Sequence, residues 1–224
     1  MKDIPTIRGR RHIASLVAEG EHSRQDFKLT IDNAHKIAHS VSAFANAGGG
    51  RLLIGVKDNG TIAGVRNEED VYVVEQAARL YCRPSVDVEF TAYSVGVNTV
   101  VIKASIPMAQ YKPIRCQEAD GSWRAYYRVA DENIVAHPLM VKAWEETRPV
   151  KFSLDSTVEQ LISFVDSHPE GVHSQEIALA LGMSQRRADN LVVNLVRSGL
   201  LNFSYHAPHF LIVRNTDEEN INTN

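Results

Sequence analysis

The sequence of 224 residues lacks the features that mark several large classes of protein. Its two cysteines, Cys82 and Cys116, lie far apart and form no metal-type cluster, which is typical of free thiols in a reducing compartment. Its longest apolar run falls far short of the roughly 20 residues that span a bilayer. The opening residues 1–11 contain no apolar core, so we expect no signal peptide. These absences predict a cytoplasmic protein that does not bind membranes.

The chain also has no strong excess of charge. A formal net charge of −3 provides no global basic field that would attract nucleic acid. Hydrophobic residues make up 44% and charged residues 23%, the balance of a globular protein with a buried core. The length suits one large domain or two small ones. We predict an N-terminal domain over 1–147, a charged linker over 148–154, a C-terminal domain over 155–214 and a disordered tail over 215–224.

The N-terminal half is organised around the stretch from Ser42 to Gly64. A helix end leads into Gly48–Gly50, and the apolar run 52–56 predicts a buried strand. Asn59-Gly60 favours a tight turn, after which residues 61–65 are expected to return as a second strand. A nucleotide phosphate loop needs the opposite order, in which glycines follow a strand and precede a helix. We therefore do not expect this protein to handle ATP.

Helices and strands alternate around this stretch. Apolar residues repeat every three or four positions over 32–47, which predicts a helix. Further helices are expected over 68–81 and 138–145, and strands over 24–29, 86–93, 97–106, 114–117 and 123–129. This pattern predicts an α/β fold, a mixed sheet with flanking helices. His35 and His39 lie four apart without a third zinc ligand in view, so we interpret them as surface histidines.

The C-terminal half has its own helical period, and its elements follow a familiar order. Helices are expected over 157–167, 175–181 and 184–198, followed by a hairpin of strands 200–205 and 210–214. Helix, helix, glycine turn, helix and hairpin is the order of a winged helix-turn-helix domain. We predict that fold for residues 155–214.

Several short motifs occur together in the N-terminal half. They are Glu21, Asp26-Phe27-Lys28, Ala43-Phe44-Ala45-Asn46, Gly48-Gly49, Ile54-Gly55-Val56-Lys57-Asp58-Asn59-Gly60, Lys112-Pro113 and Tyr127-Arg128. As a combination over about residues 12–140, they resemble the Schlafen AlbA-type family, which is also described as divergent AAA or as DNA-binding. The chain departs from the family pattern at Asp26, where the family has Glu, and at Ala130, where it has Gly. The resemblance implies a domain that acts on nucleic acid.

The resemblance also implies a catalytic alternative. In eukaryotic Schlafen relatives, acidic residues at similar positions cut tRNA and rRNA. Glu21, Asp26 and Asp58 would then hold Mg²⁺ or Mn²⁺, and Lys28 would neutralise a phosphate. Glu21 and Asp26 point to opposite faces of a regular strand, so they converge only if Glu21 lies in the preceding loop. Otherwise Asp58 is simply a residue of the Asn59-Gly60 turn.

The start of the third C-terminal helix provides candidate DNA contacts. In helix-turn-helix proteins the N-terminal residues of this helix meet base edges in the major groove. Here they are Ser184, Gln185, Arg186, Arg187 and Asn190. Residues 151–214 contain five Lys and Arg against six Asp and Glu, which is a weak basic signal for such a domain.

We therefore predict a nucleic-acid-binding protein, a transcriptional regulator that binds DNA rather than RNA and pairs as a homodimer. It needs no cofactor unless the acidic residues bind Mg²⁺ or Mn²⁺. One alternative is a divalent-metal-dependent endoribonuclease acting on structured RNA. A second is a protein-interaction module that uses its winged helix for dimerisation. The sequence favours binding over enzyme activity.

Overall fold

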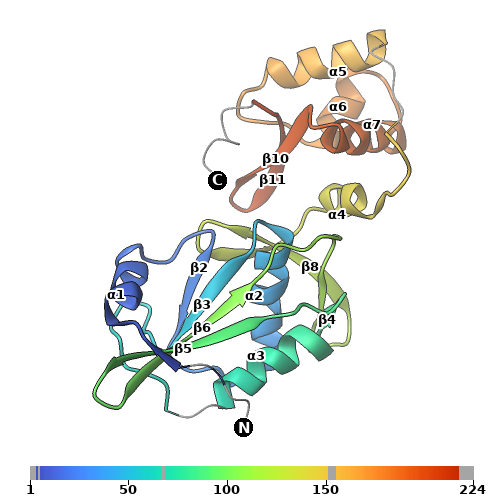
Figure 1. The fold of residues 1–224 in the computed structure, drawn as a ribbon. Coiled ribbons are helices and arrows are strands. Elements are labelled where there is room, and N and C mark those ends of the chain that lie inside the picture. Colours follow the sequence, from blue (N-terminus) through green and yellow to red (C-terminus); the bar gives the residue numbers. More distant parts are fainter. Residues whose placement is uncertain (1–3, 5, 67–68, 151–154, 217–224) are drawn as a thin grey trace. The chain divides into compact units, whose positions relative to one another are not determined.

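The structure is a computed structural model, and Figure 1 shows its fold. It describes residues 4, 6–66, 69–150 and 155–216. Their contacts divide the chain into two units, Met1–Ala136 and His137–Asn224. None of the described helices is both long enough and apolar enough to cross a membrane.

A five-stranded mixed sheet forms the centre of the first unit (Figure 1). Its strands, in spatial order, are β1 (Thr6–Arg8), β5 (Glu89–Gly96), β6 (Thr99–Ile106), β3 (Gly50–Ile54) and β2 (Gln25–Lys28). The outer pairs β1–β5 and β2–β3 are parallel, and the inner pairs are antiparallel. Strand β3 is thus flanked by β2 and β6, which places the predicted buried strand inside the sheet.

Helices cover both faces of this sheet. They are α1 (Arg10–Ala18), α2 (Ala34–Asn46) and α3 (Glu69–Leu80). Ile13 and Leu16 of α1 pack on one face beside Phe27, while α2 and α3 share a larger core on the other face. Helix α2 begins after Asn33, whose side chain accepts a hydrogen bond from the Lys36 N–H at 3.0 Å. The predicted mixed α/β fold with flanking helices is confirmed.

A second sheet packs on α2. Its strands, in spatial order, are β4 (Cys82–Arg83), β7 (Arg115–Gln117), β8 (Trp123–Val129) and β9 (Glu132–Val135). Ile114, Cys116 and Tyr126 from this sheet join the core that α2 shares with the first sheet. Helix α2 therefore lies between two sheets, which explains why nine of its residues are buried.

The predicted return strand at 61–65 is wrong. These residues form a single bridge, Val56 to Ile62, and the partners of β3 are β2 and β6 instead. The cause is Gly55, whose φ of +94° turns the chain out of the sheet. A Cβ on Gly55 would lie 2.7 Å from the Gly64 backbone, so the two segments touch without forming a ladder. The turn at Asn59-Gly60 is present, with the Gly60 N–H donating to the Lys57 carbonyl at 2.8 Å.

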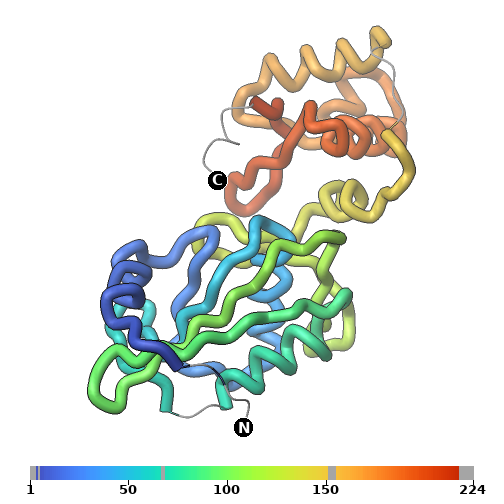
Figure 2. Tube along the Cα trace, in the orientation of Figure 1, coloured from blue at the N-terminus to red at the C-terminus, as the bar shows by residue number. Residues whose placement is uncertain are grey.

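In the part of the second unit that the structure describes there are four helices and one hairpin, and Figure 2 follows their Cα trace. They are α4 (Pro138–Glu145), α5 (Ser156–Asp166), α6 (Ser174–Ala180), α7 (Gln185–Arg197), β10 (Leu201–His206) and β11 (His209–Arg214). Residues from all four helices and both strands form one apolar core. The order from α5 to β11 is the one that the sequence predicts, and its identity as a winged helix stays a prediction.

The boundary between the units differs from the predicted one. Leu139 and Ala143 of α4 are buried in the core of the second unit, so the division falls after Ala136 rather than at 148–154. Within that predicted linker, residues 151–154 lie outside the described part of the chain. Of the predicted tail over 215–224, residues 217–224 also lie outside it. Asn215 is hydrogen bonded to the carbonyls of Leu200 and Gly199.

Candidate nucleic-acid interfaces

Two acidic side chains of the predicted trio meet beside β2. Glu21 lies in the loop before the strand, and its carboxylate accepts a hydrogen bond from the Phe27 N–H at 2.8 Å. Asp26 lies within β2 and is 5% exposed. Burial raises the pKa of Glu21, and a hydrogen bond with the Asp26 side chain raises it further. The two carboxyl groups therefore converge, because Glu21 occupies the loop and not the strand.

Cations of the protein compensate this acidic pair. Lys28 Nζ lies 2.7 Å from Asp26 Oδ2, and an Nη of Arg128 lies 3.5 Å from Asp26 Oδ1. Arg128 is 3% exposed, and its guanidinium stacks over the ring of Phe44 at 4.8 Å. Its Nε has no hydrogen-bond partner among the described residues. Two cations therefore lie against the buried carboxylate of Asp26.

Asp58 does not form a group with Glu21 and Asp26 whose donor atoms all lie within 4.8 Å of one another. Within the described ranges, the one group of three His, Cys, Asp or Glu side chains whose donor atoms all lie within 4.8 Å of one another is elsewhere in the unit. Asp58 is exposed in the turn that follows Gly55, where the positive φ carries the chain away from the sheet. Glu21 and Asp26 thus converge, and the participation of Asp58 in a three-carboxylate site for Mg²⁺ or Mn²⁺ stays a prediction.

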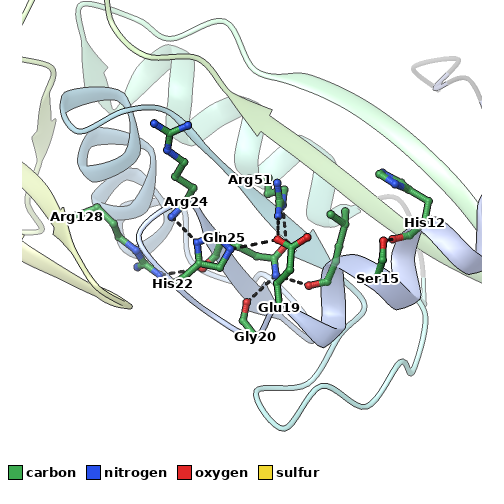
Figure 3. A network of polar contacts seen from close by, with 10 residues as sticks. His12, Ser15, Glu19, Gly20, His22, Arg24, Gln25, Arg51 and Arg128 are labelled. Atoms are coloured by element: carbon green, nitrogen blue, oxygen red, sulfur yellow. Dashed lines mark hydrogen bonds and ion pairs between the residues drawn. The ribbon is translucent and has the colours of Figure 1, made fainter. Parts of the chain in front are cut away.

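A polar network ties the end of α1 to the edge of the sheet (Figure 3). The amide of Gln25 is buried and donates to the carbonyls of Leu16 and Gly20, each at 2.6 Å. Its Oε1 accepts a hydrogen bond from Arg51 Nε at 2.6 Å, and Arg51 also pairs with Glu19. Gln25 thus orients Arg51, because its own rotamer is determined by two backbone acceptors.

A shallow hollow of about 340 Å³ lies next to this network. It is lined by the glycines 48–50 together with Arg24, Arg51 and Lys103, and with Ser105 to Met108. Gly48 lies against the Arg24 guanidinium, since a Cβ there would be 3.3 Å from an Nη atom. The Arg24 guanidinium has no hydrogen-bond or ion-pair partner among the described residues. Three cations lie around the glycine run, of which Gly48 is exposed and Gly49 is buried, and this basic surface suits phosphate.

The sequence analysis did not single out this hollow. Arg24 and Arg51 are 27 positions apart, but β2 and β3 pair in parallel so that the Arg51 N–H donates to the Arg24 carbonyl at 3.0 Å. The sequence offered one signal: Arg24 directly precedes the segment that forms β2, and Arg51 directly follows the glycines. Recognising it required the pairing of β2 with β3, which periodicity alone does not give.

The five candidate residues at the start of α7 fall into two groups. The Gln185 amide donates to Ser174 Oγ at 2.8 Å and to Asp189 at 2.7 Å, and Asn190 Oδ1 accepts from Lys142 Nζ at 2.8 Å. These side chains are thus occupied within the second unit. Ser184 is the exposed residue preceding the helix.

Arg186 and Arg187 form the other group. Both are exposed, and neither guanidinium has a partner among the described residues. They stand in the first turn of α7, the position from which a recognition helix reads DNA. The structure therefore leaves the two arginines available for an external ligand.

Helix α4 partly covers the rest of the outward face of α7. Asn190, Val193 and Arg197 follow helical spacing on the side opposite the buried stripe. Val193 is nevertheless 3% exposed, and an Nη of Arg197 donates to the Arg148 carbonyl. The segment from α4 to Pro149 lines a hollow of about 480 Å³ along this face, so the face is partly covered, while Asn190 and the first turn are exposed. The sequence analysis missed this cover because it assigned α4 to the N-terminal domain.

Comparison with known families identifies the first unit. The family described as Schlafen, AlbA_2 matches residues 21–137, about half of the chain. The chain belongs to the Schlafen AlbA_2 family. At a coarse level, membership suggests nucleic-acid binding. The match confirms the resemblance seen in the motifs, and it contains the acidic pair and the basic hollow.

Other comparisons add little. No curated protein matches the chain. Among solved structures, the chain is similar to the crystal structure of the DIP2311 protein from Corynebacterium diphtheriae, with 18% sequence identity and a TM-score of 0.42. The similarity covers 89% of this chain and 37% of that one. The Schlafen AlbA_2 match ends at residue 137, so α7 and its arginines lie outside it.

Proposed function

We propose that this Schlafen AlbA_2 protein is a cytoplasmic, DNA-binding transcriptional regulator whose second unit is a winged helix-turn-helix domain. The observation that carries the proposal is the pair of exposed, unpartnered arginines in the first turn of α7. Arginine pairs in bidentate fashion with guanine in the major groove, and each such contact contributes about 1 to 3 kcal/mol of discrimination. The order of α5, α6, α7 and the β10–β11 hairpin supports the same assignment.

The first unit would add to the affinity for DNA and would not determine which DNA sequence is bound. The second unit, residues 137–224, contains seven Lys and Arg against eleven Asp and Glu, so it supplies little phosphate neutralisation on its own. The hollow is lined by Arg24, Arg51 and Lys103, and because Arg51 already pairs with Glu19, Arg24 and Lys103 are the cations that it offers to backbone phosphates. A homodimer would double both contributions, because two recognition helices meet two half-sites.

Electrophoretic mobility shift with genomic DNA fragments and with tRNA, each with and without Mg²⁺ or Mn²⁺, tests the proposal. A shift of DNA without cleavage is the expected result. A shift of tRNA alone would contradict the DNA assignment. Absence of any shift would leave the winged unit as a protein-interaction module, the alternative noted from the sequence.

A second function is favoured by one observation. Glu21 and Asp26 converge beside Lys28, as a divalent-metal-dependent endoribonuclease would require. Cleavage of tRNA in the same assay only when Mg²⁺ or Mn²⁺ is added, and its loss in Asp26→Asn, would establish that activity. The role of Asp58 is tested in the same assay: loss of cleavage in Asp58→Ala would add it to the site, and wild-type cleavage would leave it as a turn residue.

A further inference from the structure

Three side chains with different donor atoms meet between α2 and the second sheet. They are His39 of α2, Cys116 of β7, and Glu118, which follows β7. A ring nitrogen of His39, the Sγ of Cys116 and a carboxylate oxygen of Glu118 all lie within 4.8 Å of one another. No other group of three such residues meets this criterion in the described ranges.

The surrounding contacts hold two of the three side chains in place. The His39 ring stacks on the Tyr126 ring with centroids 4.3 Å apart, and His39 Nε2 lies 3.1 Å from Glu118 Oε2. The Tyr126 hydroxyl donates to the other carboxylate oxygen of Glu118 at 2.8 Å. The prediction that His35 and His39 are surface histidines is therefore wrong. His39 is half-buried in this cluster, and His35 is half-buried against the ring of Tyr81.

The cluster is open on one side. The side chains of His39 and Glu118 are 27% and 18% exposed, while Cys116 is fully buried behind them. An ion would therefore reach the carboxylate and the imidazole first and contact the sulfur last. Water can complete its coordination from the exposed side.

We propose that His39, Cys116 and Glu118 bind a zinc ion. Zn²⁺ binds His nitrogen, Cys sulfur and Glu oxygen in proteins, whereas Mg²⁺ takes oxygen donors. Zinc bonds of about 2.0 to 2.3 Å place two ligands of a tetrahedral ion within roughly 4 Å of each other. The three donors already lie near that separation, so small rotations suffice. Three protein ligands leave a fourth position for water.

Binding exchanges a proton for the metal. Cys116 is a free thiol, so its S–H proton must leave when the sulfur binds zinc. As the sulfur–zinc bond forms, that S–H bond breaks and the proton passes to solvent. In the metal-free protein His39 Nε2 carries the ring proton, because it lies 3.1 Å from the carboxylate oxygen Oε2 of Glu118, which only accepts. On binding, that proton leaves Nε2 for solvent and Nδ1 takes one up from solvent, so the Nε2 lone pair is free for zinc. The site is separate from the acidic pair at Glu21 and Asp26.

Titration of the metal-free protein with Co²⁺ tests the proposal, since cobalt replaces zinc and its thiolate complexes absorb. We expect visible bands and a near-ultraviolet sulfur-to-cobalt charge-transfer band that Zn²⁺ abolishes by competition. Cys116→Ser should remove the charge-transfer band. The matched control is Cys82→Ser, because Cys82 is also buried and is the cross-strand partner of Cys116, yet it lies outside the donor group.

Two further variants keep the test decisive if Cys116→Ser fails to fold. Glu118→Gln and His39→Ala should each weaken Co²⁺ binding at least tenfold, and Tyr126→Phe, which removes a hydrogen bond to a ligand, about tenfold. Folded wild-type protein that shows no charge-transfer band with Co²⁺ would overturn the proposal. So would a band that survives Glu118→Gln and His39→Ala with unchanged affinity.

Discussion

The two candidate interfaces differ in whether their basic side chains are already paired with carboxylates. In the first unit, Lys28 and Arg128 lie against Asp26, and Arg51 pairs with Glu19. In the second unit, the arginines at the start of α7 have no partner among the described residues. A cation that already has a carboxylate gains less from a phosphate, because the existing pair must be given up. The partners of a basic residue therefore indicate its role better than the number of basic residues does.

Burial sharpens the contrast. Arg128 is enclosed between Asp26 and the ring of Phe44, so it belongs to the core of the first unit as much as to its surface. Arg24 is the exception in that unit, because its guanidinium lies over Gly48 without a partner. Removing the buried Arg128 should therefore destabilise the first unit strongly, whereas removing an exposed arginine of α7 should hardly change the stability of the second.

The largest effect on stability is expected at Arg128. Arg128→Ala removes a buried cation from Asp26 and leaves a cavity, so it should lower the free energy of unfolding by about 3 to 5 kcal/mol. Arg187→Ala should change it by no more than about 0.5 kcal/mol, as exposed substitutions usually do. Urea unfolding followed by circular dichroism measures both. Similar values for the two variants would contradict the contrast.

A smaller effect is expected at the glycines of the two units. Gly49 has a φ of +76°, and a Cβ there would lie 2.9 Å from the backbone nitrogen of Met108. Gly182, in the turn before α7, has a φ of +60° and nothing within 4 Å. Gly49→Ala should therefore cost about 2 to 3 kcal/mol and Gly182→Ala about 1 kcal/mol. Melting temperatures of the two variants rank them, and equal losses would mean that the hollow can relax.

The smallest effect concerns Glu21 and pH. Its pKa is raised above the ordinary value of 4.5, so the folded state holds this proton more tightly than the unfolded state does. The resulting stabilisation is fully present below pH 4.5 and is lost as the pH rises through the raised pKa. Glu21→Gln, which keeps an acceptor for the Phe27 N–H, should flatten this part of the stability profile. If the stability of Glu21→Gln varied with pH as that of wild type does, the raised pKa of Glu21 would not contribute to the stability, which would contradict the account.

Local patterns predicted the helices and most strands, because apolar spacing determines which face is buried. The helix over 32–47, the glycine run and the hairpin at the end of the chain follow from nearby residues. The strand over 61–65 failed because Gly55 leaves the sheet through a positive φ, a backbone choice that hydrophobicity does not encode.

The candidate sites depend on contacts between distant segments, and these were harder to predict. From the sequence we could state that Glu21 and Asp26 converge if Glu21 lies in the loop before the strand, since both belong to one short segment. The group of His39, Cys116 and Glu118 could not, because it requires β7 to pack on α2 across 77 positions or more. The cover of α7 by α4 was missed for the same reason.

Fluorescence anisotropy with a DNA fragment selected from the mobility shift tests the central claim most directly. The variants are Arg186→Ala and Arg187→Ala, and the control is Arg197→Ala, which removes the same charge from the covered end of α7. We expect each of the first two to weaken binding by about 1 to 3 kcal/mol and the control to bind as wild type. Wild-type affinity in both Arg186→Ala and Arg187→Ala would contradict the assignment of the first turn of α7 as the DNA-reading surface.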